Sequence, residues 1–461
     1  MKANRIIHRW HVNPCGKNRT EKNLVAGMQW LGLTKATQAP LATLVERFKK
    51  IDSLGYSSLV KQQESAAIEL VKWHKHSTRF IRPNLKFFSL KKAENAFADE
   101  FQKIKITKRR DLQTYNNLSI TKPPSGHGPT QHLFSSGSTG EPVKITRTGL
   151  SHLFFLANMM RDHIWWQRDF TQQNAVVRAN ASQRITRLSD WGAPVNQFVS
   201  SGPSLQLSFP LDLQAMKAEL ETFKPGYLSV FPSVLKGLIQ EGFDVSSIRE
   251  IRSFGEVLDD SFLKALDSLG VEKTSNLYSS QETGIIALQC PETGLLHEMS
   301  EAMIVEILDE NDVPCEPGQI GRVVITDLTN YSFPIIRYEI GDLAERGPKC
   351  RCGRPHATIK RVMGRTRNLV TYPDGSRRWP ILDIFKYEAV APVRQYQFIQ
   401  TDLETINFKY LSDRPLSKNE ELQFVRIFQA ALKHPFNFKF ERMELRMAQT
   451  SGKFEEFVSQ L

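Results

Sequence analysis

The chain has 461 residues, of which 40% are hydrophobic and 24% charged, and its formal net charge is +12. This length exceeds one ordinary domain and allows large cores. No apolar run approaches the length of a membrane span, and the first residues lack the long apolar region of a secretory signal, so we expect a soluble cytoplasmic protein. Five cysteines in a chain of this length do not suggest a disulfide framework.

The positive charge is concentrated in residues 1–110, which contain 23 Lys and Arg against 8 Asp and Glu. No recognisable nucleic-acid motif accompanies this charge, and the basic residues are scattered along helix-like sequence. A solvated face is therefore the first interpretation. A docking surface for an acidic partner comes second, and nucleic acid third.

Residues 1–105 are predicted to form a helical N-terminal segment. Residues 1–50 give no clear pattern. Residues 55–78 carry an apolar stripe at helical spacing, and residues 89–105 predict a second helix. The segment leads into Ile106–Leu112.

A run of small residues follows the strand that ends at Leu133 and Phe134. The run consists of Ser135, Ser136, Gly137, Ser138, Thr139 and Gly140. Its hydroxyls, backbone N–H groups and glycines can face phosphate oxygens. It lacks the Gly-Lys-Ser/Thr ending of a P-loop, and taken alone a hairpin turn is the favoured interpretation.

Strands and helices alternate from residue 149 to residue 345. Helices are predicted at 149–168, 212–222, 232–241 and 259–268, and strands at 175–177, 227–231, 248–254 and 274–278. This alternation predicts a parallel sheet with helices on its faces, in which ligands bind at the carboxyl ends of the strands. Three strand ends carry small or polar residues (135–140, 254–256 and 278–283), and we expect them to converge.

The predicted fold class is α/β, with a large N-terminal domain of parallel sheets flanked by helices. Its core spans residues 106–365 and includes a β-rich subdomain at about 300–362. A small mobile α+β C-terminal domain follows at residues 366–461, with a helix near 418–432.

Eight short motifs follow one another along residues 106–461. They are Ile106–Leu112, Ser135–Pro142, Phe231–Ser233, Phe254–Glu256, Tyr278–Glu282, Ile336–Asp342, Gly364–Arg365 and Thr450–Lys453. This order is known from adenylate-forming enzymes, and residues 106–461 resemble the phenylacetate–CoA ligase-like branch of that superfamily. The resemblance implies ATP-dependent activation of a small-molecule carboxylate as an acyl- or aryl-adenylate, followed by transfer to a thiol, with coenzyme A as the expected acceptor and Mg²⁺ as a cofactor.

The resemblance also implies roles for individual residues. Lys453 would place its charge at the developing α-phosphate and carboxylate oxygens, Glu282 would hold Mg²⁺, and Arg337 would contact the phosphates or hold the hinge. The expected nucleotide-binding residues are Ser135, Ser136, Gly137, Ser138, Thr139, Gly140, Gly255, Glu256, Tyr278, Ser279, Asp342 and Arg365. Phe231, Phe254 and Tyr278 hint at a pocket for an apolar or aromatic acid, although aromatic residues fill cores as often as pockets.

The sequence departs from the family pattern at four positions. Ser279 and Gln281 stand where Gly and Thr are usual, Glu141 replaces a frequent lysine, and Arg367 stands at the hinge in place of an aspartate. These changes put the nucleotide affinity and the hinge motion in question, and a catalytically inactive relative is the alternative.

A second cluster of motif residues indicates a metal. Cys350 and Cys352 form a Cys-x-Cys pair, and Cys290 and His297 lie upstream. Some members of the branch bind zinc with a Cys, a His and a Cys-x-Cys pair at corresponding places, and three Cys with one His would close a tetrahedral structural site. His356 competes with His297 as the ligand, and Cys15 and Cys315 are interpreted as bystanders. Free thiols are the alternative.

Two other functions remain open from the sequence. In the first, the acyl group passes to an acidic acyl carrier protein or to an amine, because carrier proteins are acidic and the N-terminal charge could steer them. In the second, the chain is a non-enzymatic basic binding module. The sequence does not identify the carboxylate or the oligomeric state, for which a homodimer is one arrangement, and it predicts no membrane or nucleic-acid partner.

Overall fold

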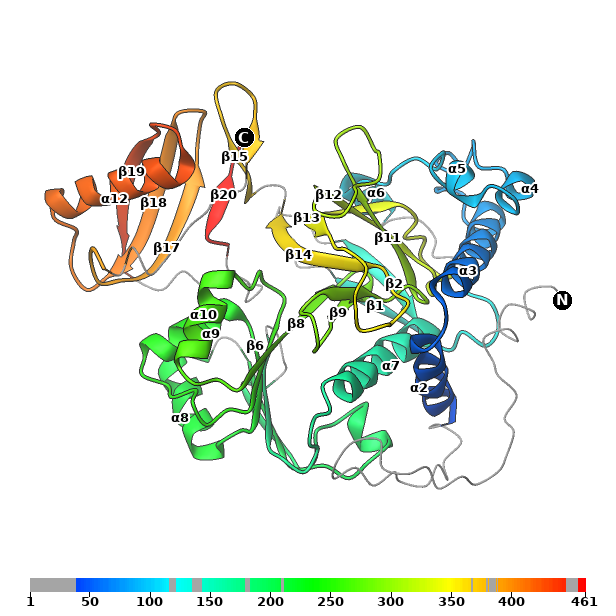
Figure 1. The fold of residues 1–461 in the computed structure, drawn as a ribbon, viewed down its shortest axis with the longest axis horizontal. Helices are drawn as coiled ribbons and strands as arrows, with labels where there is room; N and C mark the ends of the chain where they lie inside the picture. The colour runs from blue at the N-terminus through cyan, green and yellow to red at the C-terminus, as the bar shows by residue number, and fades with distance from the viewer. Residues whose placement is uncertain are drawn as a thin grey trace.

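The computed structural model describes residues 39–115, 122–134, 143–178, 183–208, 211–365, 368–378, 380, 387, 389–444 and 455–461 (Figure 1). The helical N-terminal segment is observed in residues 39–101. Its helices are α2 (Ala39–Asp52), α3 (Tyr56–Ser77), α4 (Leu90–Ala93) and α5 (Phe97–Phe101), and α6 (Arg109–Tyr115) follows. The single helix predicted at 89–105 is thus wrong, because Asn95 and Ala96 leave the helix between α4 and α5.

A continuous sheet of twelve strands organises the large domain. Its order is β11-β12-β13-β14-β10-β9-β8-β7-β6-β3-β5-β4. The neighbours β5, β3, β6, β7 and β8 run parallel, as the alternating pattern predicts. The bounds are β3 (Asn174–Arg178), β4 (Ile185–Leu188), β5 (Ser204–Ser208), β6 (Tyr227–Val230), β7 (Glu250–Phe254) and β8 (Lys273–Ser280).

Helices cover both faces of the parallel half. The helices α8 (Leu213–Phe223), α9 (Pro232–Gln240) and α10 (Asp260–Ser268) bury their apolar stripes on one face, in a core that includes Leu220, Leu235 and Leu266. On the other face lie α7 (Gly149–Trp165) and α2, which packs against α7 (Figure 1). The 3₁₀ turn Val195–Gln197 joins that second core.

The β-rich region continues the same sheet in antiparallel pairing. Its strands are β9 (Gly284–Gln289), β10 (Leu296–Glu298), β11 (Met303–Leu308), β12 (Ile320–Asp327), β13 (Tyr338–Arg346) and β14 (Thr358–Arg365). Because β8 pairs with the parallel β7 on one side and the antiparallel β9 on the other, the two halves share one hydrogen-bonded ladder.

The strands on either side of the small-residue run form a sheet of their own, which corrects one expectation. The strands β1 (Thr130–Phe134) and β2 (Lys144–Thr148) pair antiparallel in a two-stranded sheet of their own. A short connection between neighbouring strands permits only this antiparallel pairing. The strand that precedes residues 135–140 is therefore not part of the parallel sheet.

The C-terminal region forms a small α+β unit. The strands β17 (Val393–Gln400), β18 (Thr405–Ser412), β19 (Asn437–Met443) and β20 (Phe457–Ser459) make a four-stranded sheet with the order β19-β18-β17-β20. The helix α12 (Lys418–Leu432) begins with a capping box from Ser417 and Glu420, and the hairpin of β15 (Val370–Thr371) and β16 (Arg377–Arg378) precedes the sheet. Aromatic rings fill its core, among them Phe398, Phe408 and Phe428.

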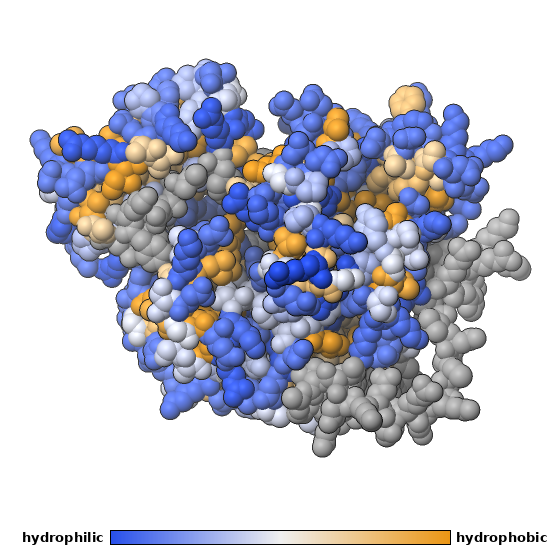
Figure 2. All heavy atoms as spheres, in the orientation of Figure 1, coloured by the Kyte–Doolittle hydropathy of each residue, from blue (hydrophilic) through white to orange (hydrophobic). Residues whose placement is uncertain are grey.

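Among the residues that the structure describes, no helix is long and apolar enough to cross a membrane. Hydrophilic side chains dominate the face that Figure 2 shows, and the apolar residues on it are dispersed in small patches.

Candidate functional site

The ends of the parallel strands bring together four predicted residues. Phe231 follows β6 and Phe254 ends β7, and their ring centroids lie 4.7 Å apart. The turn after β7 contains Gly255, whose φ of +78° favours glycine. The next residue, Glu256, accepts 2.8 Å hydrogen bonds from the backbone N–H and the hydroxyl of Ser233. Glu256 thereby satisfies a donor in the first turn of α9 and fixes the turn beside the two rings.

Tyr278, Asp342 and Arg365 meet in a second part of the site. Asp342 in β13 and Arg365 in β14 are cross-strand partners, and Nε of Arg365 lies 3.0 Å from Oδ1 of Asp342. The phenol of Tyr278 in β8 donates a 2.7 Å hydrogen bond to Oδ2 of the same carboxylate. A carboxylate accepts about four hydrogen bonds, so these contacts use about half of the accepting capacity of Asp342.

The electrostatics keep Tyr278 protonated and Arg365 charged. Burial and the charge of Asp342 raise the pKa of Tyr278 well above its ordinary value, so the phenol stays a donor. Asp342 also raises the pKa of Arg365, so the guanidinium stays charged. Asp342 itself is only 8% exposed.

Glu282 places a second buried carboxylate near the first. It lies in the turn between β8 and β9 and is 4% exposed. Nη1 of Arg109 is 3.4 Å from its Oε1. Its charge acts on Tyr278 and on Arg365, and it also acts on Arg147, which donates a 3.1 Å hydrogen bond to the carbonyl of Gln281. Two carboxylates and three arginines therefore share one neighbourhood at the centre of the sheet.

Sequence reasoning missed two of these arginines. Arg109 lies inside the motif Ile106–Leu112, which could have indicated its importance although not its partner. Arg147 lies in β2, and no motif marks it. Tertiary structure alone brings both beside the β8–β9 turn.

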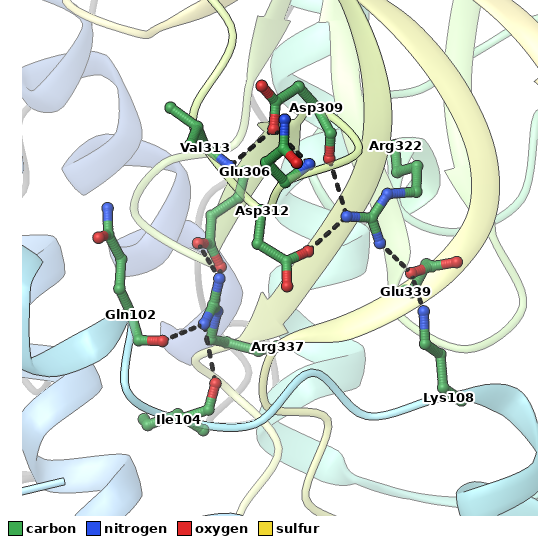
Figure 3. A network of polar contacts seen from close by, with 11 residues as sticks. Gln102, Ile104, Lys108, Glu306, Asp309, Asp312, Val313, Arg322, Arg337 and Glu339 are labelled. Atoms are coloured by element: carbon green, nitrogen blue, oxygen red, sulfur yellow. Dashed lines mark hydrogen bonds and ion pairs between the residues drawn. The ribbon is translucent and has the colours of Figure 1, made fainter. Parts of the chain in front are cut away.

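Arg337 lies elsewhere, in a network of its own (Figure 3). Its Nε and Nη2 each donate a 3.0 Å bond to the carboxylate of Glu306, and its Nη1 donates to the carbonyls of Gln102 and Ile104 at 2.7 and 2.8 Å. Four of the five N–H donors of a guanidinium are thus engaged with protein oxygens. These contacts tie the N-terminal segment to β11, and the expected role of Arg337 at the phosphates or the hinge stays a prediction.

Several predicted positions lie outside the described residues. They are the phosphate loop Ser135–Gly140, Glu141, Arg367 and the catalytic candidate Lys453, and also Cys15. Ser279 is described and half-buried, at an irregularity in the pairing of β8 with β9.

The four predicted metal ligands form one cluster. The ligand atoms of Cys290, His297, Cys350 and Cys352 all lie within 4.8 Å of one another. Sγ of Cys290 is 3.8 Å from Sγ of Cys350, and Sγ of Cys352 is 3.2 Å from Nε2 of His297. The cluster joins the β9–β10 hairpin to the loop between β13 and β14.

The two candidate histidines differ in whether a ring nitrogen lies among the cysteine sulfur atoms, and His297 is the one in the cluster. The ring of Trp165 packs edge-on against His297 with centroids 5.6 Å apart. His356 instead lies with Nε2 3.0 Å from Oδ1 of Asp52 and is not part of the cluster of ligand atoms. Cys315 is buried beside Gly321 and lies outside the cluster, as predicted.

Comparisons with known proteins agree with this architecture. No protein-family profile matches the chain. A segment of 163 residues is 28% identical to phenylacetate-coenzyme A ligase of Thermus thermophilus, covering 33% of this chain and 36% of that relative. The match therefore spans about a third of the length of the curated relative.

Solved structures show the fold over most of the chain. The chain matches 2-hydroxyisobutyryl-CoA ligase in the postadenylation state, in complex with 2-HIB-AMP, with a TM-score of 0.68 at 14% identity, over 89% of this chain and 92% of that one. The same ligase in the thioesterification state, in complex with 2-HIB-AMP and CoA, gives a TM-score of 0.57 at 14% identity, over 89% and 91% of the two chains. The chain thus has the fold of this acyl-CoA ligase, including its small C-terminal domain.

Proposed function

We propose that this chain is an ATP-dependent ligase that activates a carboxylate as its adenylate and then transfers the acyl group to coenzyme A. In the first step a carboxylate oxygen attacks the α-phosphorus of ATP and pyrophosphate leaves. In the second step a thiol sulfur attacks the acyl carbon, AMP leaves and the thiol proton is released. The observation that carries the proposal is the convergence of Tyr278, Asp342 and Arg365, with Glu282 beside them, on this fold.

Each group has a physical role in that reaction. Asp342 has accepting capacity for the two ribose hydroxyls, and Tyr278 and Arg365 hold its carboxylate in place. Glu282 offers the oxygen ligand that Mg²⁺ prefers, and the ion would neutralise charge on the phosphates. Arg109 and Arg147 add positive charge close to Glu282 at the base of the β1–β2 hairpin. Lys453 remains our candidate for the charge at the α-phosphate.

We extend the proposal to a structural zinc ion at Cys290, His297, Cys350 and Cys352. Tetrahedral zinc with bonds of about 2.3 Å to sulfur places two sulfur ligands about 3.8 Å apart. The Cys290–Cys350 distance of 3.8 Å fits that value. Three thiolates and one imidazole fill all four positions, which favours a structural over a catalytic ion. The ion would fasten the β9–β10 hairpin, and with it the β8–β9 turn that carries Glu282.

Pyrophosphate exchange tests the first step. We expect carboxylate-dependent exchange between ATP and labelled pyrophosphate with some member of a panel of aryl, fatty and small hydroxy acids. The double variant Thr139→Ala/Gly140→Ala should depress exchange and leave the circular dichroism spectrum unchanged. Absence of exchange across the panel, with ATP binding confirmed by calorimetry, contradicts the proposal.

One feature favours a carrier protein as a second candidate acceptor. Residues 72–92 contain seven Lys and Arg and no Asp or Glu. Lys86, Lys91 and Lys92 are exposed there, and Nζ of Lys86 lies 5.5 Å from the ring centroid of Phe87, whose exposed fraction is 70%. An acidic carrier fits this surface by charge. Acyl transfer to an acidic carrier protein that outpaces transfer to coenzyme A, and that falls in Lys91→Glu/Lys92→Glu, supports this acceptor. Equal transfer by the variant contradicts it.

A further inference from the structure

Lys236 makes the clearest ionic contact between the large domain and the C-terminal unit. Its Nζ lies 3.1 Å from Oε1 of Glu456 and 3.1 Å from Oδ2 of Asp259. Its side chain is 15% exposed. Lys236 comes from α9 and Asp259 caps α10, so both belong to the large domain. Glu456 precedes β20 and belongs to the C-terminal sheet.

The backbone around Glu456 is fixed to that sheet. The carbonyl of Glu456 accepts a 2.8 Å hydrogen bond from the N–H of Phe398, and the carbonyl of Glu455 accepts a 2.9 Å bond from Nε2 of Gln397. Both donors lie in β17. The position of Glu456 is therefore tied to the C-terminal sheet through its backbone, whereas its carboxylate is bound by Lys236 of the large domain.

Both partners of the Lys236–Glu456 ion pair lie close in sequence to residues that contact the candidate site. Lys236 is one helical turn beyond Ser233, whose N–H and hydroxyl bind Glu256. On the C-terminal side, the charge of Glu455 acts on Arg365, the partner of Asp342. Three peptide units join Glu456 to Lys453, which limits the separation of their Cα atoms to about 11 Å.

Lys236 stays positively charged in this contact. Burial alone would lower the pKa of Lys236, but Glu456 and Asp259 together raise it above its ordinary value. A buried cation that loses one of two carboxylate partners is left poorly compensated. The position of the C-terminal sheet relative to α9 is thus linked to an ion pair that an alternative position would break.

We propose that Lys236 is a positioning residue, which through Glu456 holds the C-terminal unit in the orientation that serves adenylation. The inference rests on the proposed function. Lys236 contacts neither nucleotide nor carboxylate substrate in this scheme. Through Glu456 it sets where Glu455 and Glu456 lie relative to the site at Asp342 and Arg365.

The kinetic test compares the two half-reactions in Lys236→Met, Lys236→Arg and Glu456→Gln. Both neutral variants should lower kcat for pyrophosphate exchange about tenfold, with KM for ATP changed less than about twofold, because a lost orientation reduces the reactive fraction and leaves the ATP contacts intact. Thioester formation from added acyl-adenylate and coenzyme A should stay at the wild-type rate. Lys236→Arg should restore exchange. The double variant Lys236→Met/Glu456→Gln should be no slower than either single variant.

A matched control separates this role from a general loss of a lysine. Lys217→Met removes a lysine whose ion pair with Glu221 stays inside α8. It should leave both half-reactions unchanged. Wild-type exchange in Lys236→Met, or an equal loss in Lys217→Met, overturns the inference, whereas no exchange in the wild-type protein contradicts the proposed function instead.

A distance measurement tests the inference without activity. One fluorophore is placed in α8 and another in α12 through unnatural amino acids, and the distribution of their separation is measured by single-molecule energy transfer. Lys236→Met and Glu456→Gln should broaden it, and Lys217→Met should not. A distribution identical to wild type in both neutral variants overturns the inference.

Discussion

Tyr278 and Asp342 lie on different halves of one sheet, and the phenol of the first donates a 2.7 Å hydrogen bond to the carboxylate of the second. The parallel strand β8 carries the tyrosine, and the antiparallel strand β13 carries the aspartate. The nucleotide site that we propose is thus built across the place where the pairing pattern of the sheet changes.

Removing this hydroxyl should weaken nucleotide binding. A hydrogen bond to a charged group contributes about 1.5–3 kcal/mol, so Tyr278→Phe should raise KM for ATP roughly tenfold or more. Tyr372→Phe is the matched control, because its hydroxyl donates to the carbonyl of Leu432 in the C-terminal unit. An unchanged KM in Tyr278→Phe, measured by pyrophosphate exchange, would remove Asp342 from the nucleotide site.

Arg337 and Arg109 should respond in opposite ways to the same substitution. Arg337→Gln leaves Glu306 without its buried partner and should lower the free energy of unfolding by about 3–5 kcal/mol, with exchange by the folded fraction retained. Arg109→Gln should lower exchange and cost less stability, because its contact with Glu282 is longer, at 3.4 Å, and the charge of Arg147 still acts on Glu282. Urea unfolding and exchange assays on both variants check this. Lost exchange in a fully folded Arg337→Gln protein would return Arg337 to the catalytic group.

Zinc content should depend on the four-residue cluster. We expect one zinc ion per chain by inductively coupled plasma mass spectrometry. Cys290→Ser and Cys350→Ser should lose it and unfold at a lower temperature, since binding to the native state stabilises that state. Cys315→Ser removes another buried cysteine and should keep the metal. A purified protein without zinc, whose melting temperature is unaffected by added zinc, contradicts the structural site.

Mild acid should destabilise the contact between α3 and the β-rich region. His74 is fully buried, with Nε2 3.2 Å from the carbonyl of Asn330 and Nδ1 2.9 Å from the hydroxyl of Thr78. Burial lowers its pKa from 6.5 to about 4. The unfolded chain therefore binds a proton at His74 more readily than the folded chain does. The contribution of neutral His74 to the free energy of unfolding is fully present above pH 6.5 and is lost as the pH decreases toward 4.

The pKa shift of His74 predicts a change in the free energy of unfolding that is large enough to measure. The shift corresponds to roughly 3 kcal/mol of unfolding free energy lost between pH 6.5 and 4. Urea unfolding at several pH values should show a shallower dependence in His74→Gln. His76→Gln changes an exposed histidine at the end of the same helix and should keep the wild-type slope. An identical slope in His74→Gln would assign the pH dependence to other groups.

Local sequence patterns predicted most of the regular structure. The apolar stripes of α3, α8, α9 and α10 and the strands β6, β7 and β8 follow directly from periodicity. The helix α2 was missed although Leu41, Leu44, Phe48 and Ile51 have helical spacing. The short strands β4 and β5 gave too little pattern to be recognised.

From the sequence, only those residues of the candidate site that belong to recognised motifs could be predicted. Tyr278, Asp342 and Arg365 come from three motifs, and the structure places them in contact. The pairing of Arg337 with Glu306 could not be predicted, because Glu306 lies in β11, Arg337 directly precedes β13, and only the fold fixes their separation. The contact of Arg109 with Glu282 could not be predicted either, because the two residues are 173 positions apart in the sequence and only the fold brings them together.

The contact between Asp52 and His356 has a consequence for how the chain is made. Asp52 ends α2, and its partner lies 304 residues later in the sequence. At 5–20 residues per second a ribosome needs roughly 15–60 s to synthesise the chain between them. Most of the apolar stripe of α2 packs against α7, about 100 residues later, so it stays uncovered for only the first part of that interval. Slow translation between α2 and α7 would therefore prolong the exposure of an apolar helix, and holding chaperones should bind nascent chains that end before α7.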